Sequence, residues 1–489
     1  MSGLKKLASD TAIYGVSSVL GRILNLVLTP IYTKKFLPGA YGVFVDLYAF
    51  IAMINVALIF GMETTFFRHV QDEKKVGEVY AQAFIWVTSL ATLFLILGLL
   101  LHQPIANLLG YPENANWIIF TVIVIFLDVC AALPMAKLRH EGKAVRFATI
   151  NLINIALTIA LNLILIFGLG AKLDYIFIAN MAASSLRMVM AFYGNIPDTF
   201  KPDKTLMKEL VNYGFYIMIA GLAGILAQML DRVLIPRIWV DGTLWEGIAR
   251  TGEEMNGLYG ANYKVAMLIG LATQAFRYAV EPFFFKKAKD KDSPETFARV
   301  FHYYILAALV GFLVLASFAR ELVSIEVFGY SFLDEKYWPA LTIVPILLMA
   351  YVMNGAYVNL SIWFKITKQV RFAILFTGVG VLITILINLL TIRHFGYMGS
   401  AWSALICFTT MTVMVYLLGQ KYYPIPYRIS RLLAYLLVFV GAYLINRQIG
   451  DVNGLFFVFF WKTSVVLFAI AVVAFSEKYF PVFGEAPSS

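Results

Sequence analysis

The sequence predicts an all-α polytopic membrane protein in which two parallel six-helix repeats precede two further helices. Three observations predict this architecture. Hydrophobic residues make up 61% of the 489-residue chain and charged residues 14%, whereas soluble proteins carry about 45–50% apolar and about 25% charged residues. Apolar runs close to the ~20 residues that cross a bilayer as a helix recur along the chain. Two distant segments also repeat one residue pattern.

Fourteen transmembrane spans are expected, and the basic residues set their orientation. Most lysines and arginines fall in alternate loops, which places these loops and both termini in the cytoplasm. The net charge of +10 is then explained by basic loops facing anionic lipid, so we expect no nucleic-acid partner. Met1–Asp10 is short and polar, so the first helix is expected to be retained. The expected spans are Thr11–Tyr32, Gly42–Phe60, Tyr80–Leu101, Trp117–Ala136, Phe147–Leu169, Tyr175–Tyr193, Tyr213–Trp239, Leu258–Val280, Tyr303–Ile325, Trp338–Trp363, Phe372–Ile392, Tyr397–Leu418, Leu432–Asn446 and Leu455–Phe475.

The repeat is clearest between Tyr41–Arg68 and Tyr259–Lys286, each interpreted as one membrane-spanning helix. Both begin with Tyr-Gly and end with a Glu, a pair of Phe and a basic residue. Lys143–Ala148 (KAVRFA) likewise returns as Lys368–Ala373 (KQVRFA). Because six helices return the chain to the same side of the membrane, the repeats are parallel. The predicted domains are one six-helix lobe over residues 1–195, a second over 196–420, and two additional helices with a short cytoplasmic tail over 421–489.

Motifs for catalysis and cofactor binding are absent from the sequence. There is no Walker A lysine motif, GxSxG nucleophile motif or HExxH zinc motif. Cys130 and Cys407 both fall inside apolar spans, where a buried thiol behaves as a small hydrophobic group. No connecting loop is long enough to form a separate soluble domain. We therefore expect no enzymatic activity, no cofactor and no metal site.

Ionisable residues inside the spans are the candidate functional residues. A centred Arg, Lys or Asp costs about 2.5–3.5 kcal/mol on insertion scales, so each should face protein or a wet cavity. Arg22 lies near the middle of its helix, where it lines a cavity or meets a buried partner. Asp128 is either a structural hydrogen-bonding group or a coupling residue, and Lys462 is close enough to a span end to reach the interface. The candidates are Arg22, Asp46, Asp128, Asp231, Arg232, Lys264, Arg277 and Lys462.

Two pairs of neighbouring charges have alternative interpretations. Asp231 and Arg232 project about 100° apart from one helix, so one is expected to face a cavity and the other a neighbouring helix. Arg277 and Glu281 are spaced to pair with each other on one helix face. Glu281 also lies close to Lys286, a second possible partner.

Asp46 and Lys264 occupy equivalent positions of the repeat but carry opposite charges. Parallel repeats place equivalent positions opposite one another if both point inward, so we predict a salt bridge that closes the outer end of a cavity in the inward-open state. The alternative is that each residue meets water at a span end. Glu63, nearer the cytoplasmic end, is expected to pair with Arg68.

Several segments together resemble one transporter family. They are AIYGVSSVLGRILNLVLTPIYTKKFLPGAYGVFVDLYAF near the N-terminus, GMETTFFR, Gln228–Arg232 (QMLDR) and His394–Trp402 (HFGYMGSAW). This pattern resembles the bacterial polysaccharide and oligosaccharide flippases of the multidrug/oligosaccharidyl-lipid/polysaccharide exporter superfamily. The resemblance extends over essentially the whole chain.

The resemblance implies two lobes, alternating access and a lipid-linked substrate. That substrate is an oligosaccharide repeat unit on undecaprenyl diphosphate, moved to the outer leaflet of the bacterial cytoplasmic membrane for surface polysaccharide synthesis. A diphosphate needs cationic partners in a cavity, and the expected contacts are Arg22, Arg232, Lys264 and Arg277. Gating or ion coupling is expected from Asp46, Asp128 and Asp231. Membrane lipids, a polysaccharide polymerase and glycosyltransferases are the partners that this role implies.

Other functions remain open at the level of sequence. An ion-coupled multidrug or cation antiporter and a flippase for the peptidoglycan lipid precursor have the same fold. The fourteen spans and the surplus of intramembrane cations favour the polysaccharide exporter over the antiporter. A membrane-embedded glycan polymerase or ligase is disfavoured by the short outer loops.

Overall fold

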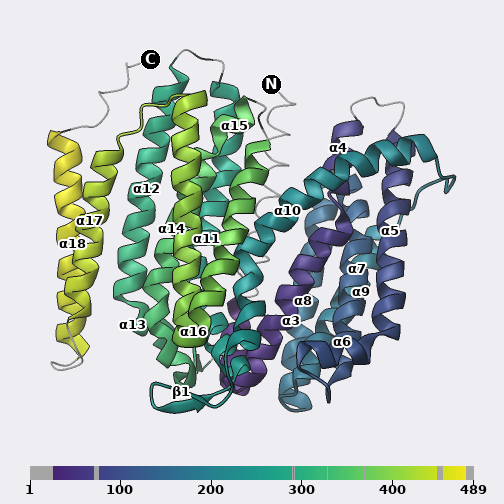
Figure 1. Ribbon diagram of the computed structural model, residues 1–489, viewed down its shortest axis with the longest axis horizontal. Coiled ribbons are helices and arrows are strands. Elements are labelled where there is room, and N and C mark those ends of the chain that lie inside the picture. Colours follow the sequence, from purple (N-terminus) through teal and green to yellow (C-terminus); the bar gives the residue numbers. More distant parts are fainter. Residues whose placement is uncertain are drawn as a thin grey trace. The chain divides into compact units, whose positions relative to one another are not determined.

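Helices form nearly all of the described chain (Figure 1). The computed structural model describes residues 26–70, 76–288, 290, 292–327, 329–367, 369, 371–448 and 455–480. The chain divides into two compact units, Met1–Gly257 and Leu258–Ser489. This division follows packing and does not test the sequence repeat, so the domain limits 1–195, 196–420 and 421–489 stay predictions.

The first unit consists of long helices, short helices at their ends and one β-hairpin. Helix α7 lies at its centre, in contact with α3, α5, α8 and α9. Its apolar sequence is the most buried of the candidate spans. The elements are α2 (Thr29–Lys35), α3 (Pro38–Ile59), α4 (Met62–His69), α5 (Val76–Leu100), α6 (His102–Leu109), α7 (Ala115–His140), α8 (Ala144–Gly168), α9 (Leu173–Phe192), α10 (Lys204–Ile238), the antiparallel strands β1 (Thr243–Trp245) and β2 (Ile248–Arg250), and the first turns of α11 (Gly252–Lys287).

The second unit contains most of α11 and every later element. Helix α14 packs on α16 and α12, and α12 in turn packs on α17. The elements are α12 (Ser293–Ser317), α13 (Ala319–Ser324), the paired strands β3 (Glu326–Val327) and β4 (Tyr330–Ser331), the 3-10 helix η2 (Glu335–Ile343), α14 (Val344–Leu360), α15 (Ile362–Ile366), α16 (Arg371–Tyr422), α17 (Ile429–Arg447) and α18 (Leu455–Tyr479).

Within the described residues, 11 helices are long and apolar enough to cross a membrane. One of these, α16, is two helices joined at Gly396, whose backbone is non-helical, as the two separate predicted spans require. Helix α11 is not among the 11, because polar residues such as Lys264 and Arg277 interrupt it. Most of the first predicted span, Thr11–Tyr32, lies outside the described residues. The all-α membrane fold is confirmed, and the count of fourteen stays a prediction.

The segment Tyr41–Arg68 is not one continuous helix, which corrects the sequence interpretation. Phe60 and Gly61 both have positive φ, at 57° and 66°, and they separate α3 from α4. The break lies against α10. A Cβ added at Gly214 of α10 would stand 2.7 Å from the carbonyl oxygen of Phe60. The absence of a side chain at Gly214 therefore allows the bend to approach α10 closely.

A second close contact joins α3 to the first turns of α11 within the first unit. A Cβ added at Gly42 would lie 1.8 Å from the carbonyl oxygen of Glu253, and one at Gly257 would lie 1.8 Å from that of Pro38. Asn256 donates a hydrogen bond to the carbonyl oxygen of Gly42 at 3.0 Å. Small residues thus let these two backbones touch, as they do in membrane helix pairs.

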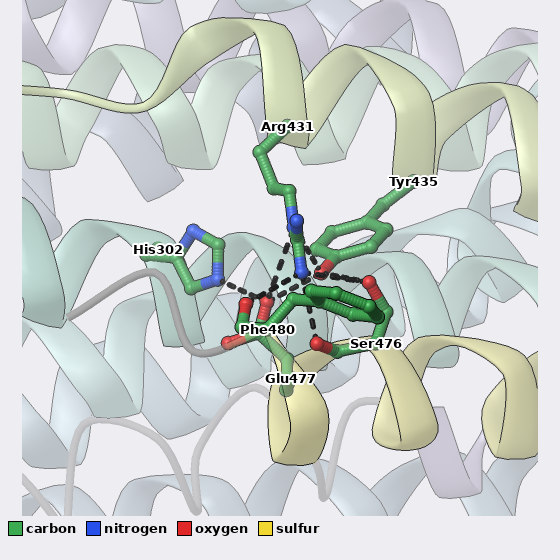
Figure 2. A network of polar contacts seen from close by, with 6 residues as sticks. All are labelled: His302, Arg431, Tyr435, Ser476, Glu477 and Phe480. Carbon is green, nitrogen blue, oxygen red and sulfur yellow. Dashed lines mark hydrogen bonds and ion pairs between the residues drawn. The ribbon is translucent and has the colours of Figure 1, made fainter. Parts of the chain in front are cut away.

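The last two helices are fastened to α12 by a polar network (Figure 2). Arg431, Tyr435 and His302 converge on Glu477 of α18, at distances of 3.8, 2.5 and 3.1 Å from its Oε1. Arg431 also donates to the hydroxyl of Ser476 at 2.7 Å. The α17–α18 pair is therefore held to the second unit by charge-assisted hydrogen bonds as well as by apolar packing.

Candidate functional site

A polar pocket of about 270 Å³ lies inside the first unit. We call it the carboxylate–arginine pocket, because its wall contains two carboxylates and two guanidinium groups. Those residues come from α4, α7 and α9, while α3 and α8 supply amide and apolar groups. The lining residues are Asn55, Ile59, Glu63, Asp128, Ala132, Met135, Arg139, Phe147 and Arg187.

Asp128 and Arg187 form one of the two ion pairs in this pocket. Arg187 Nη1 stands 3.3 Å from Asp128 Oδ1, and the hydroxyl of Ser184 donates to the same oxygen at 2.9 Å. Their side chains are about one quarter exposed, at 25% and 23%. The carboxylate therefore borders the pocket and is not sealed in the core, as expected for a charge in the middle of a membrane helix.

Glu63 and Arg139 form the second ion pair. The Arg139 guanidinium also lies 5.2 Å from the ring centre of Phe67 and 5.8 Å from that of Phe147. The predicted Glu63–Arg68 pair is wrong, because residues five apart project from different helix faces. Arg68 instead donates to the hydroxyl of Tyr213 at 3.3 Å.

Three polar atoms of this pocket have no hydrogen-bond partner within the described residues. They are Nε of Arg139, Nε of Arg187 and Oδ1 of Asn55. A buried donor or acceptor left unmet costs about 1–3 kcal/mol. The three atoms are themselves buried, so a ligand in the pocket would contact them only after their side chains move.

The second unit has an ion pair at the equivalent end of its own repeat. Glu281, the counterpart of Glu63, binds Lys365 at 2.5 Å. The predicted pairing of Glu281 with Arg277 or Lys286 is therefore wrong. Arg277 lines a narrow cavity of about 10 Å³ beside this pair, with its guanidinium 5.7 Å from the ring centre of Tyr278.

Asp46 is held within the first unit by residues that the sequence interpretation did not assign to it. Its side chain is 0% exposed. Arg237 donates to both of its oxygens, at 2.8 and 2.9 Å, and the hydroxyl of Tyr111 donates at 2.8 Å. Burial and the Asp46 carboxylate raise the pKa of Tyr111 far above its usual range. Pairing of Asp46 with Lys264, which belongs to the second unit, stays a prediction.

Asp231 and Arg232 lie together, contrary to the expectation that they face different ways. Arg232 Nη1 is 3.0 Å from Asp231 Oδ1 and donates to the carbonyl oxygen of Gln228 at 2.6 Å. The long arginine side chain folds back along α10, so the 100° separation of the Cβ atoms does not keep the charges apart. Both side chains are buried.

Of the two remaining predicted substrate contacts, the structure describes one. Lys264 is half-buried on α11, and Arg22 lies outside the described residues. The sequence interpretation missed Arg139, Arg187 and Arg237, because it counted them as loop cations when assigning orientation. Helices α7 and α10 include Arg139 and Arg237 in their last turns, and α9 includes Arg187, so these side chains reach back into the bundle.

Comparison with known proteins places the chain in a family. The model of the polysaccharide biosynthesis protein family matches residues 7–287, more than half of the chain. The chain belongs to this family. A relative from Haloferax volcanii, described as the probable low-salt glycan biosynthesis flippase Agl15, is 20% identical over 404 residues. That alignment covers 82% of this chain and 80% of the relative.

Solved structures show the same fold at low sequence identity. The lipid II flippase MurJ, in an inward closed conformation, is 13% identical with a TM-score of 0.74, covering 95% of this chain and 98% of MurJ. An inward-facing multidrug resistance MATE family transporter of the MOP superfamily is 16% identical with a TM-score of 0.65, covering 85% and 96%. The family member described here is thus a multi-pass membrane protein with the fold of MOP transporters.

Proposed function

We propose that this protein flips oligosaccharides linked to undecaprenyl diphosphate from the cytoplasmic to the outer leaflet of a bacterial cytoplasmic membrane, by alternating access. The observation that supports it best is the meeting of Arg139 and Arg187 in one wet pocket of a membrane-spanning unit. Guanidinium groups suit diphosphate oxygens because their donors match phosphate bidentately. The flippase relative and the family support the same role. A polymerase and glycosyltransferases would act beside it.

The carboxylates of the pocket suggest how binding is coupled to an ion gradient. In the structure Glu63 binds Arg139 and Asp128 binds Arg187. A diphosphate competes with these carboxylates for the arginines, and an ion that binds the carboxylates in place of the arginines favours the exchange. In this proposal Arg22, Arg232, Lys264 and Arg277 provide further cationic contacts, while Asp46 and Asp231 act in gating.

Export of organic cations is the second candidate function. Both carboxylates that line the pocket are bound to arginine, and both arginines are bound to a carboxylate. The pocket is thus balanced in charge, and a ligand of either sign would have to open these pairs. The preference for an anionic substrate rests on the flippase relative and the family.

Complementation of a strain that lacks its oligosaccharide flippase tests this function. Arg139→Gln and Arg187→Gln should abolish surface glycan at normal expression, whereas Arg393→Gln, which changes an exposed arginine, should not. Each single variant leaves one carboxylate without its cation. This carboxylate is removed as well in the double variants Glu63→Gln/Arg139→Gln and Asp128→Asn/Arg187→Gln, which should therefore regain thermal stability. If they also restore glycan export, the arginines have only a structural role and the proposed function of the pocket is wrong.

A further inference from the structure

A second, larger cavity lies at one end of α8 and α9. Its volume is about 800 Å³, and it is formed within the first unit. It begins where α8 starts and α9 finishes, at the end of two membrane-spanning helices. The residues that line it are Gly142, Lys143, Ala144, Val145, Arg146, Thr149, Ile150, Val189, Met190 and Tyr193. We call it the α8–α9 groove.

The rim of the α8–α9 groove is basic. Lys143 and Arg146 belong to the repeated KAVRFA pattern, which the proposed transport mechanism does not use. Glu141 is the sole carboxylate in the stretch 137–146. It is shared by Lys143 at 2.6 Å and Lys137 at 3.9 Å, so positive charge remains in excess. An anion at the rim would therefore be attracted.

Arg146 is oriented by the end of α9. Its Nη2 donates to the carbonyl oxygens of Met190, at 3.3 Å, and Tyr193. Its guanidinium also lies 5.7 Å from the ring centre of Tyr193. Both bonds to carbonyl oxygens use Nη2, which leaves Nη1 without an acceptor among the described residues. The charge is thus fixed at the rim before any ligand arrives.

The walls of the groove are apolar and exposed. Val145 and Val189 are 72% and 60% exposed. The same two helices expose further large apolar residues, namely Leu152, Ile153, Ile164, Phe167 and Leu186. This combination of a cationic rim and an apolar wall matches a lipid with a phosphate headgroup and hydrocarbon chains.

We propose that the α8–α9 groove binds an anionic phospholipid of the cytoplasmic leaflet, with its phosphate on Lys143 and Arg146 and its acyl chains along Val145 and Val189. A glycan headgroup is a poorer occupant, because the groove offers sugar hydroxyls few polar side chains beyond Thr149. The site is independent of the transported substrate, so its failure leaves the proposed function untouched.

Native mass spectrometry of the full-length protein tests this site, with phosphatidylglycerol as the anionic probe and phosphatidylcholine as the zwitterionic one. Phosphatidylglycerol should bind more tightly. Each removed charge should weaken phosphatidylglycerol binding about fivefold. The affinity of Lys143→Gln/Arg146→Gln for phosphatidylglycerol should therefore be about 25-fold lower than that of the wild type. The control Lys204→Gln/Lys208→Gln removes two exposed lysines and should bind as the wild type does. Val189→Trp fills the groove with both charges retained, and should also lose the lipid.

Four outcomes would overturn the proposal. They are equal binding of the two lipids, wild-type binding by Lys143→Gln/Arg146→Gln, wild-type binding by Val189→Trp, and an equal loss in the lysine control. Two competition arms separate other sources of phosphate. Displacement of phosphatidylglycerol by a lower concentration of undecaprenyl phosphate would assign the groove to the substrate's carrier lipid. Displacement by inorganic phosphate would assign it to a free anion.

Discussion

Asp46, Glu63, Asp128 and Asp231 each bind an arginine of the same unit. A buried ion pair adds little net stability compared with apolar packing, because both charges lose hydration. Loss of one partner is costly, since the remaining charge is then buried alone. The three pairs that join different helices, those of Asp46, Glu63 and Asp128, therefore fix which helices lie next to one another. Two of these three, in the carboxylate–arginine pocket, are also accessible to a ligand.

The Asp46–Arg237 pair gives the sharpest test of this principle. Arg237→Gln leaves a fully buried carboxylate without its cation, so we expect a loss of about 3–5 kcal/mol of stability. Asp46→Asn/Arg237→Gln removes both charges and should recover most of it. Thermal unfolding in detergent measures both variants, with the exposed Arg393→Gln as control. An unfolding temperature for Arg237→Gln equal to that of the wild type would show that the pair adds no stability.

At the scale of elements, the break between α3 and α4 turns Glu63 toward Arg139. The sequence predicted the helix but not its break, because Phe60 has no preference for positive φ and Gly61 is one of many glycines in apolar spans. The close approach of Gly214 stabilises the bend, and such a tertiary contact is invisible to a pattern of residues. The kink at Gly396 was easier to predict, because His394 and Tyr397 interrupt the apolar run there.

Two glycines of α10 provide a matched test of the bend. Gly214→Ala places a Cβ 2.7 Å from the carbonyl oxygen of Phe60, whereas a Cβ at Gly224 has nothing within 4 Å. Gly214→Ala should therefore lower both the unfolding temperature and glycan export. Gly224→Ala should be neutral or stabilise by up to about 1 kcal/mol, because alanine favours helix. The role assigned to the contact fails if the two variants behave alike.

The contacts that hold α17 and α18 to α12 can also be tested by mutation. Glu477→Ala removes the acceptor shared by His302 and Tyr435, and a lost hydrogen bond to a charged group costs about 1.5–3 kcal/mol. We expect a lower unfolding temperature than for Glu113→Ala, which changes an exposed loop residue. Equal unfolding temperatures would show that apolar packing alone holds the two helices.

At the scale of the whole molecule, composition and the recurring apolar runs were sufficient to predict a helical membrane protein, and the resemblance of several segments predicted its family. The ion pairs agree with the predicted repeat, because Glu63 and Glu281 each bind a basic residue of another helix in their own unit. The partners were not predictable. Arg139 lies beyond the predicted end of its span, and Arg187 and Arg237 lie toward the ends of theirs, so all three were counted as loop charges. Their ion pairs in the structure show that they reach inward.

The partner of Asp46 decides whether its salt bridge forms within one unit or between the two repeats. The sequence repeat predicts Lys264, whereas Arg237 and Tyr111 occupy both carboxylate oxygens in the structure. Two charge swaps separate these possibilities in the complementation assay. Because Asp46→Lys would set a cation against Arg237, we expect Asp46→Lys/Lys264→Asp to export no better than either single variant. Asp46→Arg/Arg237→Asp restores the attraction with its direction reversed, so it should recover part of the export lost in its single variants. If only Asp46→Lys/Lys264→Asp recovers export, a salt bridge between the repeats would be established instead.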